Sequence, residues 1–243
     1  MGMRGTLYGV GVGPGDPELM SLKAARILKS VPVVAFFAKK GATGNARRAV
    51  DGHLNPEAEL VRLDYPFTTE LPESDPHYRA ALAEFYDAAA ASLAARLDRG
   101  QDVAVLCAGD PFFYGSYAHL HERLAPTHVC EVIPGITAMS GCWTRALTPM
   151  TCGDEMLTVL SGTMPAEMLA HRLAGSDAVV IMKVGRNLAK IRQALAHAGM
   201  LERAIYVERG TMPEERILRL ADKPDDEAAY FGIVLVPGAR KPL

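Results

Sequence analysis

The stretch Leu7-Tyr-Gly-Val-Gly-Val-Gly-Pro-Gly-Asp16 decides the fold, because an apolar run passes directly into a glycine-rich loop. The run Leu7–Val12 predicts a short buried strand. Two further glycine-rich segments also follow apolar runs, namely Cys107-Ala-Gly-Asp-Pro-Phe-Phe-Tyr-Gly115 and Glu131-Val-Ile-Pro-Gly-Ile-Thr137. In an open α/β sheet, ligands bind just outside the carboxyl ends of the strands. Three such loops therefore predict a binding cleft built by one face of a sheet.

The first loop fits neither of two common phosphate-binding patterns. A dinucleotide fingerprint G-x-G-x-x-G requires glycine at its sixth position, but that position is Pro14 counted from Gly9 and Asp16 counted from Gly11. No Lys-Ser or Lys-Thr pair follows the loop, as a P-loop requires. The glycines would still allow positive φ angles and a close approach of the backbone to a ligand or to another loop. A tight strand-to-helix turn without a ligand is the alternative interpretation.

The composition is that of an ordinary globular protein. Of the 243 residues, 49% are hydrophobic and 22% are charged, which suits one large domain or two small ones. The longest apolar stretch, near Val31 to Ala38, is far too short to span a membrane, and we expect no secretory signal. We therefore expect a cytoplasmic protein without a membrane partner. The net charge of −2 argues against a nucleic-acid partner.

The cysteines and histidines predict no metal site. His119 and His121 are close in sequence, but no acidic or cysteine partner completes a set of metal ligands. The cysteines are spaced too widely for a zinc knuckle or a redox pair, and we expect them to remain thiols. They are Cys107, Cys130, Cys142 and Cys152.

Strand-like and helix-like segments alternate along the chain, which indicates α/β architecture. Ser21 is the expected N-cap of the first helix, with Leu22, Ala25 and Leu28 on one face. Gly100 is expected to end an alanine-rich helix as its C′ residue. The expected strands are 7–12, 31–37, 59–63, 102–107, 129–133, 157–160, 178–184, 204–208 and 233–236. The later expected helices are 46–54, 78–97, 113–124, 136–146, 164–173 and 188–198, with a proline-rich loop at 65–76 and a strand or helix at 214–220.

At the three glycine-rich loops the chain resembles the tetrapyrrole methylase family, the class III S-adenosylmethionine (SAM) methyltransferases. The matching motifs are Gly-x-Gly-Pro-Gly-Asp at Gly11–Asp16, Gly-Asp-Pro-x-x-Tyr-Gly at Gly109–Gly115 and Pro-Gly-Ile-Thr-Ala at Pro134–Ala138. Their order and spacing match as well, and the resemblance covers nearly the whole chain. It implies two α/β domains with a cofactor cleft between them, which we place at residues 1–134 and 135–243. It also implies a homodimer.

Within that family the chain is most similar to the precorrin-2 C20-methyltransferase branch. The segments that carry this similarity are Asp110–Ser116, Ile181–Asn187 and Tyr206–Met212. The similarity implies methylation of precorrin-2 at C20 to give precorrin-3A in cobalamin (vitamin B12) biosynthesis. Cobalt-factor II C20-methyltransferases share the same pattern, so the metal state of the substrate stays open. One departure is Ala108, where we expect an acidic residue, and it weakens any role for a carboxylate at that position.

The resemblance also implies which residues contact SAM, whose product after transfer is S-adenosylhomocysteine. Asp110 would face the cationic end of SAM or a hydroxyl, but a turn residue before proline is the alternative interpretation. For Met182 the alternative is ordinary core packing. Backbone groups exposed by glycine turns can hydrogen-bond a cofactor. The implied contacts are Pro14, Ala108, Gly109, Asp110, Phe113, Thr137, Ala138, Met182 and Gly210.

The implied tetrapyrrole substrate bears many acetate and propionate groups, and such anions favour basic clefts. A solvated basic loop is the alternative interpretation for the cluster between residues 39 and 48. The catalytic task would be alignment of the reacting atoms. No base for the C20 proton stands out, since Tyr114 and Tyr117 lie near the second loop but ordinary packing is the favoured explanation for both. The candidate carboxylate partners are Lys39, Lys40, Arg47, Arg48, Lys183 and Arg186.

Three rival functions remain open at this point. The first is a methylase of the same fold that acts on another ring carbon, or on protein or RNA, although the net charge disfavours RNA. The second is a nucleotide-dependent oxidoreductase, against which the missing sixth-position glycine argues. The third is a non-catalytic binding protein that retains the cleft.

Overall fold

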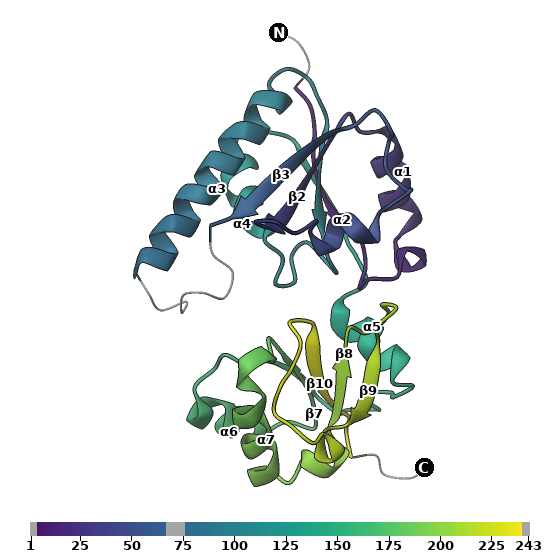
Figure 1. The fold of residues 1–243 in the computed structure, drawn as a ribbon, viewed down its shortest axis with the longest axis vertical. Helices are drawn as coiled ribbons and strands as arrows, with labels where there is room; N and C mark the ends of the chain where they lie inside the picture. The colour runs from purple at the N-terminus through teal and green to yellow at the C-terminus, as the bar shows by residue number, and fades with distance from the viewer. Residues whose placement is uncertain (1–3, 67–75, 240–243) are drawn as a thin grey trace. The chain divides into compact units, whose positions relative to one another are not determined.

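A computed structural model describes residues 4–66 and 76–239, and the predicted loop 65–76 lies almost entirely outside them. The chain divides into two compact units, Met1–Thr137 and Ala138–Leu243, each built around its own sheet (Figure 1). No helix of the described residues is long and apolar enough to cross a membrane.

The first unit is a five-stranded, wholly parallel sheet in the order β3-β2-β4-β1-β5. The central strand β4 has side chains buried on both faces: Val103, Val105 and Cys107 pack on one side, Ala104 and Leu106 on the other. This alternation is the period of two that a strand imposes. The strands are β1 Leu7–Gly11, β2 Val33–Lys39, β3 Glu59–Tyr65, β4 Val103–Cys107 and β5 Cys130–Ile133.

Helices cover both faces of this sheet (Figure 1). Buried side chains of α3 and α4 pack on one face, and those of α1 and α2 on the other. The expected C′ role of Gly100 is confirmed, because its φ is +79° and its N–H donates to the carbonyl of Leu97, 2.9 Å away. The helices are α1 Leu22–Ser30, α2 Asn45–Ala49, α3 Pro76–Leu97 and α4 Tyr117–Leu124, with a 3₁₀ turn η1 at Pro17–Leu19.

Two expectations for these helices are wrong in detail. Ser21 does cap α1, since its hydroxyl accepts from the N–H of Ala24 at 3.2 Å, but Leu22 is 91% exposed. The buried face is Ala24, Ile27 and Leu28, because residues three and four apart share a helix face whereas residues six apart do not. Helix α4 begins at Tyr117 rather than at residue 113, since the second glycine loop takes up the intervening residues.

The second unit is a mixed five-stranded sheet in the order β6-β7-β10-β8-β9. Strands β6 and β7 are parallel, whereas β10 runs antiparallel to both β7 and β8, and β9 runs antiparallel to β8. The segment expected as a strand or a helix is therefore a strand. The strands are β6 Leu157–Ser161, β7 Ala178–Met182, β8 Ile205–Glu208, β9 Arg216–Arg219 and β10 Gly232–Val236.

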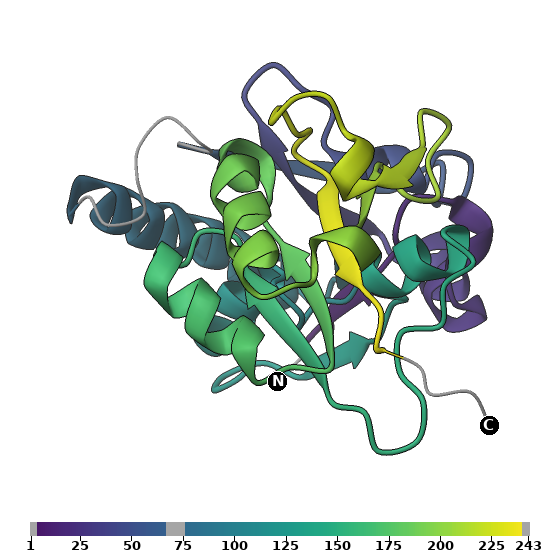
Figure 2. The ribbon, with the colours of Figure 1, turned by 90° about the horizontal axis from the view of Figure 1, so that it is seen from below.

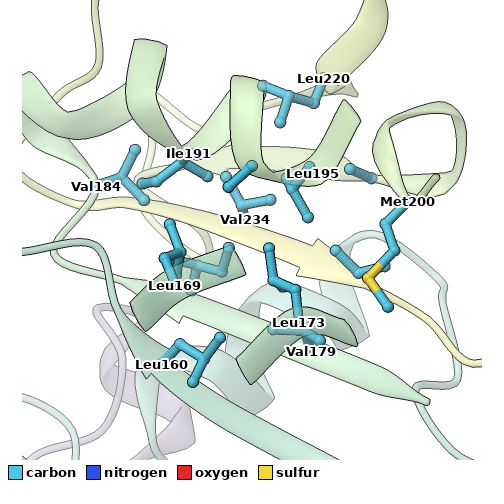
Figure 3. Close-up of a cluster of buried hydrophobic side chains, with 14 of the residues drawn as sticks. Leu160, Leu169, Leu173, Val179, Val184, Ile191, Leu195, Met200, Leu220 and Val234 are labelled. Carbon is cyan, nitrogen blue, oxygen red and sulfur yellow. The ribbon is translucent and has the colours of Figure 1, made fainter. Parts of the chain in front are cut away.

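Two apolar clusters hold the second unit together. On one face, α6 and α7 pack side by side (Figure 2). The leucine and isoleucine side chains of these helices pack against valine side chains of β7 and β10 (Figure 3). On the other face, α5 packs with Cys142 against Val180 and Val207. The helices are α5 Ala138–Arg145, α6 Ala166–Ala174 and α7 Leu188–His197, with 3₁₀ turns η2 Gly185–Asn187, η3 Leu201–Arg203 and η4 Leu220–Asp222.

Candidate functional site

The three glycine-rich loops meet at one edge of the first sheet. They follow β1, β4 and β5, which are adjacent and parallel, so all three loops leave the same ends of their strands. An isolated antiparallel bridge joins the first two loops beyond the strands, and in it the N–H of Gly109 donates to the carbonyl of Gly13 at 2.7 Å. The loops therefore meet at one edge, as their positions after apolar runs indicate, and the binding cleft stays a prediction.

Glycines at this edge let the loops touch one another. A Cβ on Gly11 would lie 2.6 Å from the backbone nitrogen of Gly135 and 2.8 Å from the carbonyl oxygen of Gly109. A Cβ on Gly135 would lie only 2.0 Å from that same oxygen. At Gly11 and Gly135 the absence of a side chain therefore allows one loop to approach another closely.

The carboxylate of Asp110 ties the second loop to the third. Its Oδ1 accepts from the N–H of Phe112 at 2.9 Å, and its Oδ2 accepts from the N–H of Gly135 at 3.1 Å. The turn interpretation of Asp110 is thus confirmed, and its carboxylate also spans two loops. Each carboxylate oxygen has a second lone-pair site, so a ligand hydroxyl or cation can still bind there.

A hydrogen bond between two hydroxyl groups attaches the far end of the second loop to β3. The Tyr65 hydroxyl, at the end of β3, is hydrogen-bonded to the hydroxyl of Ser116, which directly follows the loop. The Tyr65 ring stacks on Phe37 of β2 with centroids 5.3 Å apart. Burial raises the pKa of Tyr86 in α3. The Tyr65–Ser116 contact therefore holds the end of the loop, and Asp110 holds its beginning.

All six cofactor contacts implied for the first unit lie on these loops. Pro14 and Gly109 are buried, whereas Ala108 is exposed at the end of β4. Tyr114 is exposed with a left-handed φ of +55°, a conformation rare for a residue other than glycine. The structure brings together Pro14, Ala108, Gly109, Asp110, Phe113 and Thr137.

A shallow pocket of about 420 Å³ adjoins the first and third loops. Its walls are Pro134, Gly135 and Ile136 on one side and Glu18–Ser21 on the other. Its size lies within the usual range for sites that take small organic ligands.

In the second unit, the loops after β6, β7 and β8 leave the same edge of the sheet. Both β7 and β8 are antiparallel to β10, so they are parallel to each other, and β6 is parallel to β7. Met182 ends β7 and Gly210 follows β8 at this edge. The Met182 side chain packs against the apolar cluster beneath α5, which matches the packing interpretation. Ala138 is the first residue of α5.

The loop that carries Gly210 has a strained backbone. Arg209 and Thr211 have left-handed φ angles of +50° and +71°. Each such residue costs of order 1–3 kcal/mol and persists only where surrounding groups hold it. Gly210 itself lies directly on α5, since a Cβ there would be 2.6 Å from the sulfur of Cys142. The Cys142 thiol is inert in this position, because burial raises its pKa to about 12.

An ion pair that the sequence did not reveal holds this strained loop. Arg145, the last residue of α5, donates through Nε to both carboxylate oxygens of Glu215 at 2.9 Å. Glu215 Oε2 also accepts from the N–H of Thr211 at 2.7 Å. The hydrogen bond from Arg145 is the main cause that lowers the pKa of Glu215. The two partners lie 70 positions apart, so no local motif pointed to the pair.

The basic residues expected to bind the substrate carboxylates lie on different elements of the two units. Lys39 and Lys40 lie at the end of β2, at the same edge as the glycine loops, because β2 is parallel to β4. Arg47 and Arg48 both belong to α2, in agreement with the helix expected from residue 46, so the loop interpretation of these two residues is wrong. The Arg47 guanidinium pairs with Asp51 and is only 20% exposed.

Arg48 is exposed and donates to Asn45 at 3.0 Å. In the second unit, Lys183 directly follows β7 and Arg186 lies in the 3₁₀ turn η2, and both are exposed. Lys183 has a left-handed φ of +54°.

Comparison with known proteins identifies the family of this chain. The family model for tetrapyrrole (corrin/porphyrin) methylases matches residues 6–222. The chain belongs to this family. The methylase is 55% identical over 234 residues to a precorrin-2 C(20)-methyltransferase of a Sinorhizobium species, covering 96% of each chain. It is also 30% identical over 237 residues to a cobalt-precorrin-2 C(20)-methyltransferase of Salmonella typhimurium, covering 96% of the methylase and 97% of that protein.

Solved structures agree on the fold. A cobalt-precorrin-4 methyltransferase superimposes on the methylase with a TM-score of 0.73 at 21% identity, covering 96% of this chain and 94% of the other. The fold is therefore the two-domain fold of tetrapyrrole methyltransferases, as the resemblance implied. The methylase uses SAM, in keeping with its family, and the nucleotide-dependent oxidoreductase is set aside.

Proposed function

We propose that the methylase transfers a methyl group from SAM to C20 of precorrin-2, giving precorrin-3A in cobalamin biosynthesis. The observation that carries this proposal is the identity of 55% to a precorrin-2 C(20)-methyltransferase, because it extends over 96% of both chains. The joined glycine loops support it, since they gather the implied cofactor contacts of the first unit at one sheet edge.

The residues present fit SAM. Ala108 and Ala138 have small side chains, so a cofactor can approach the backbone at these positions, and we propose that Gly109 and Gly210 contact it through their backbone groups. We propose that Pro14, Phe113 and Thr137 contact SAM as well, and that Met182 contributes an apolar surface. Asp110 keeps acceptor capacity beside its two backbone partners, so it suits a ribose hydroxyl or a cationic group.

The chemistry asks little acid–base assistance from the protein. SAM supplies a methyl group activated by a cationic sulfur. The main contribution of the chain is to fix the reacting groups in line and at short range, which lowers the entropic part of the barrier. The clamped second loop serves this purpose, because Asp110 and Ser116 hold it at its two ends. We assign no residue as the base that removes the C20 proton.

We propose that the substrate carboxylates meet basic side chains at the two sheet edges. The best candidates lie at or shortly after strand ends in their own units. They are Lys39, Lys40, Lys183 and Arg186. Arg47 is the weakest of the original candidates because its guanidinium is engaged by Asp51. Charge reversal at Lys40 is expected to raise the KM for substrate in a salt-dependent way, whereas reversal at Arg47 is expected to act mainly on stability.

The experiment that tests the reaction is anaerobic incubation with SAM and either metal-free precorrin-2 or cobalt-factor II, followed by mass spectrometry. A gain of one CH₂ mass on the metal-free substrate supports the proposal, and isotope labelling then locates the methyl group at C20. A gain only on the cobalt form favours the alternative, a cobalt-factor II C20-methyltransferase, which the relative of Salmonella typhimurium supports. No gain on either, with SAM still bound, overturns the substrate.

We further propose that the methylase is a cytoplasmic homodimer whose two domains correspond to residues 1–134 and 135–243. The support for the dimer is the resemblance to the family, and sedimentation of the purified protein tests it. A monomer at micromolar concentration that retains full activity would contradict this proposal.

A further inference from the structure

Helix α5 contacts the loop after β8 at two points, and both belong to the second unit. The first point is steric: Cys142 lies beneath Gly210, where a Cβ would be 2.6 Å from its sulfur. The second is ionic: one turn further along the helix, Arg145 binds Glu215 through Nε at 2.9 Å and through Nη2 at 2.8 Å. The loop is therefore fixed against the helix in both distance and direction.

Glu215 connects this anchor to the strained part of the loop. Its Oε2 accepts from the N–H of Thr211 at 2.7 Å, and its own N–H donates to Met212 at 3.1 Å. Thr211 is β-branched and has a φ of +71°, which is an outlier for such a residue. A residue keeps this conformation only where surrounding groups over-determine it, and Glu215 is one of the groups that does so.

The pair also links two proposed cofactor contacts. Ala138 begins α5 and Arg145 ends it, while Gly210 lies immediately before Thr211. Because a helix is stiff, the Arg145–Glu215 pair sets the position of Gly210 relative to Ala138. Neither charged residue is itself one of the proposed contacts. The Glu215 side chain is 15% exposed and Arg145 is 57% exposed, so the pair is partly shielded from water on the glutamate side.

We infer that Arg145 and Glu215 are positioning residues for SAM, which hold the Arg209–Thr211 backbone in its binding-competent conformation. This inference rests on the proposed function, specifically on Ala138 and Gly210 as cofactor contacts. It predicts an effect on cofactor affinity that exceeds any effect on the affinity for the tetrapyrrole.

The test is calorimetric titration of S-adenosylhomocysteine into the full-length wild-type protein and three variants. Glu215→Gln keeps an oxygen that can accept from Thr211 but loses the ion pair. Arg145→Lys keeps the charge but loses the two-pronged geometry. Arg219→Gln is the matched control, because Arg219 forms an exposed ion pair with Asp222 in the same unit. We expect Glu215→Gln to raise the Kd by about tenfold or more, Arg145→Lys to raise it less, and Arg219→Gln to leave it unchanged.

A stability measurement separates positioning from simple loss of structure. A misplaced loop raises the Kd and the KM for SAM in a variant that urea titration shows to be fully folded under the assay conditions, whereas loss of structure raises the apparent Kd only in proportion to the unfolded fraction. The first result supports the inference and the second overturns it. Wild-type affinity in both Glu215→Gln and Arg145→Lys also overturns it. If the wild-type protein itself fails to bind S-adenosylhomocysteine, the proposed function fails first, and that outcome is distinct from the others.

Discussion

The Oδ2 atom of Asp110 accepts a hydrogen bond from the backbone N–H of Gly135 at 3.1 Å, across 25 positions of sequence. With its other oxygen on Phe112, this carboxylate both shapes the second glycine loop and fastens it to the third. The Asp110 carboxylate therefore holds the two loops together even without a ligand.

Replacement of Asp110 by alanine removes both acceptors and leaves two backbone N–H groups without them. We expect the free energy of unfolding to fall by about 1–2 kcal/mol, measured by urea titration. Asp110→Asn keeps one carboxamide oxygen, so it should lose roughly half as much. Alanine at the exposed Asp154 is the control. Equal free energies of unfolding for the wild type and Asp110→Ala would show that the two hydrogen bonds of Asp110 do not stabilise the fold.

Replacement of Gly135 by alanine tests whether the loops must touch. The added Cβ would lie 2.0 Å from the carbonyl oxygen of Gly109, so the loops must separate, at a cost of about 1–3 kcal/mol. Affinity for S-adenosylhomocysteine should fall as well. Gly175→Ala is the matched control, because nothing lies within 4 Å of its added Cβ and its φ is −109°. Equal stability and equal affinity of Gly135→Ala and Gly175→Ala would show that the close approach of Gly135 to Gly109 is not required.

Leucine at position 147 is predicted to reduce stability. Its φ is +50° and its side chain is 89% exposed just beyond α5, a place where glycine is the usual residue. Leu147→Gly should raise the free energy of unfolding by about 1 kcal/mol, since glycine avoids the left-handed penalty. Thermal unfolding measures the change, and a lower melting temperature would contradict this interpretation.

The Arg145–Glu215 pair predicts a pH dependence of stability. The folded-state pKa of Glu215 is lowered from the usual 4.5, chiefly by the hydrogen bond from Arg145. A lowered folded-state pKa gives stability that is present above pH 4.5 and is lost as the pH falls through the folded value. Urea unfolding of the wild type and Glu215→Gln should therefore differ at neutral pH and converge in acid. A difference that grows in acid would contradict the assignment.

Thiol reactivity should divide the cysteines by burial. Cys107 and Cys142 are buried and Cys152 is exposed, and burial raises the pKa of both buried thiols. A disulfide reagent at mildly alkaline pH should modify Cys152 quickly in the native protein. Cys107 and Cys142 should react only on unfolding, which mass mapping of the labelled peptides can check. Rapid native labelling of Cys142 would show that α5 detaches readily from Gly210.

Local patterns made much of the fold and of the first unit's site predictable. The glycine loops after residues 11, 107 and 133 stood out because glycine and proline follow apolar runs within a few positions, and the α/β alternation placed them at one edge. The positions of the individual helices were also mostly right. The error at Leu22 arose because its spacing of six from Leu28 was read as a shared face.

Contacts between distant segments were not predictable from the sequence. Asp110 and Gly135 are 25 positions apart, and Arg145 and Glu215 are 70 apart. Each of these residues has an ordinary surface or turn interpretation by itself, and only the folded chain shows the partner. The pairing of Arg47 with Asp51 is local, because the two residues are four apart on the helix expected from residue 46.

The position of β10 has a consequence for biosynthesis. This strand lies between β7 and β8 and pairs with both, so the β6–β7 and β8–β9 halves of the second sheet remain apart until Gly232–Val236 arrives. A ribosome releases the chain from its N-terminal end, and domains generally fold as they emerge. The first unit can therefore complete its sheet early, whereas the second must wait for its last strand, with two apolar half-sheets exposed in the meantime to chaperones or to other nascent chains.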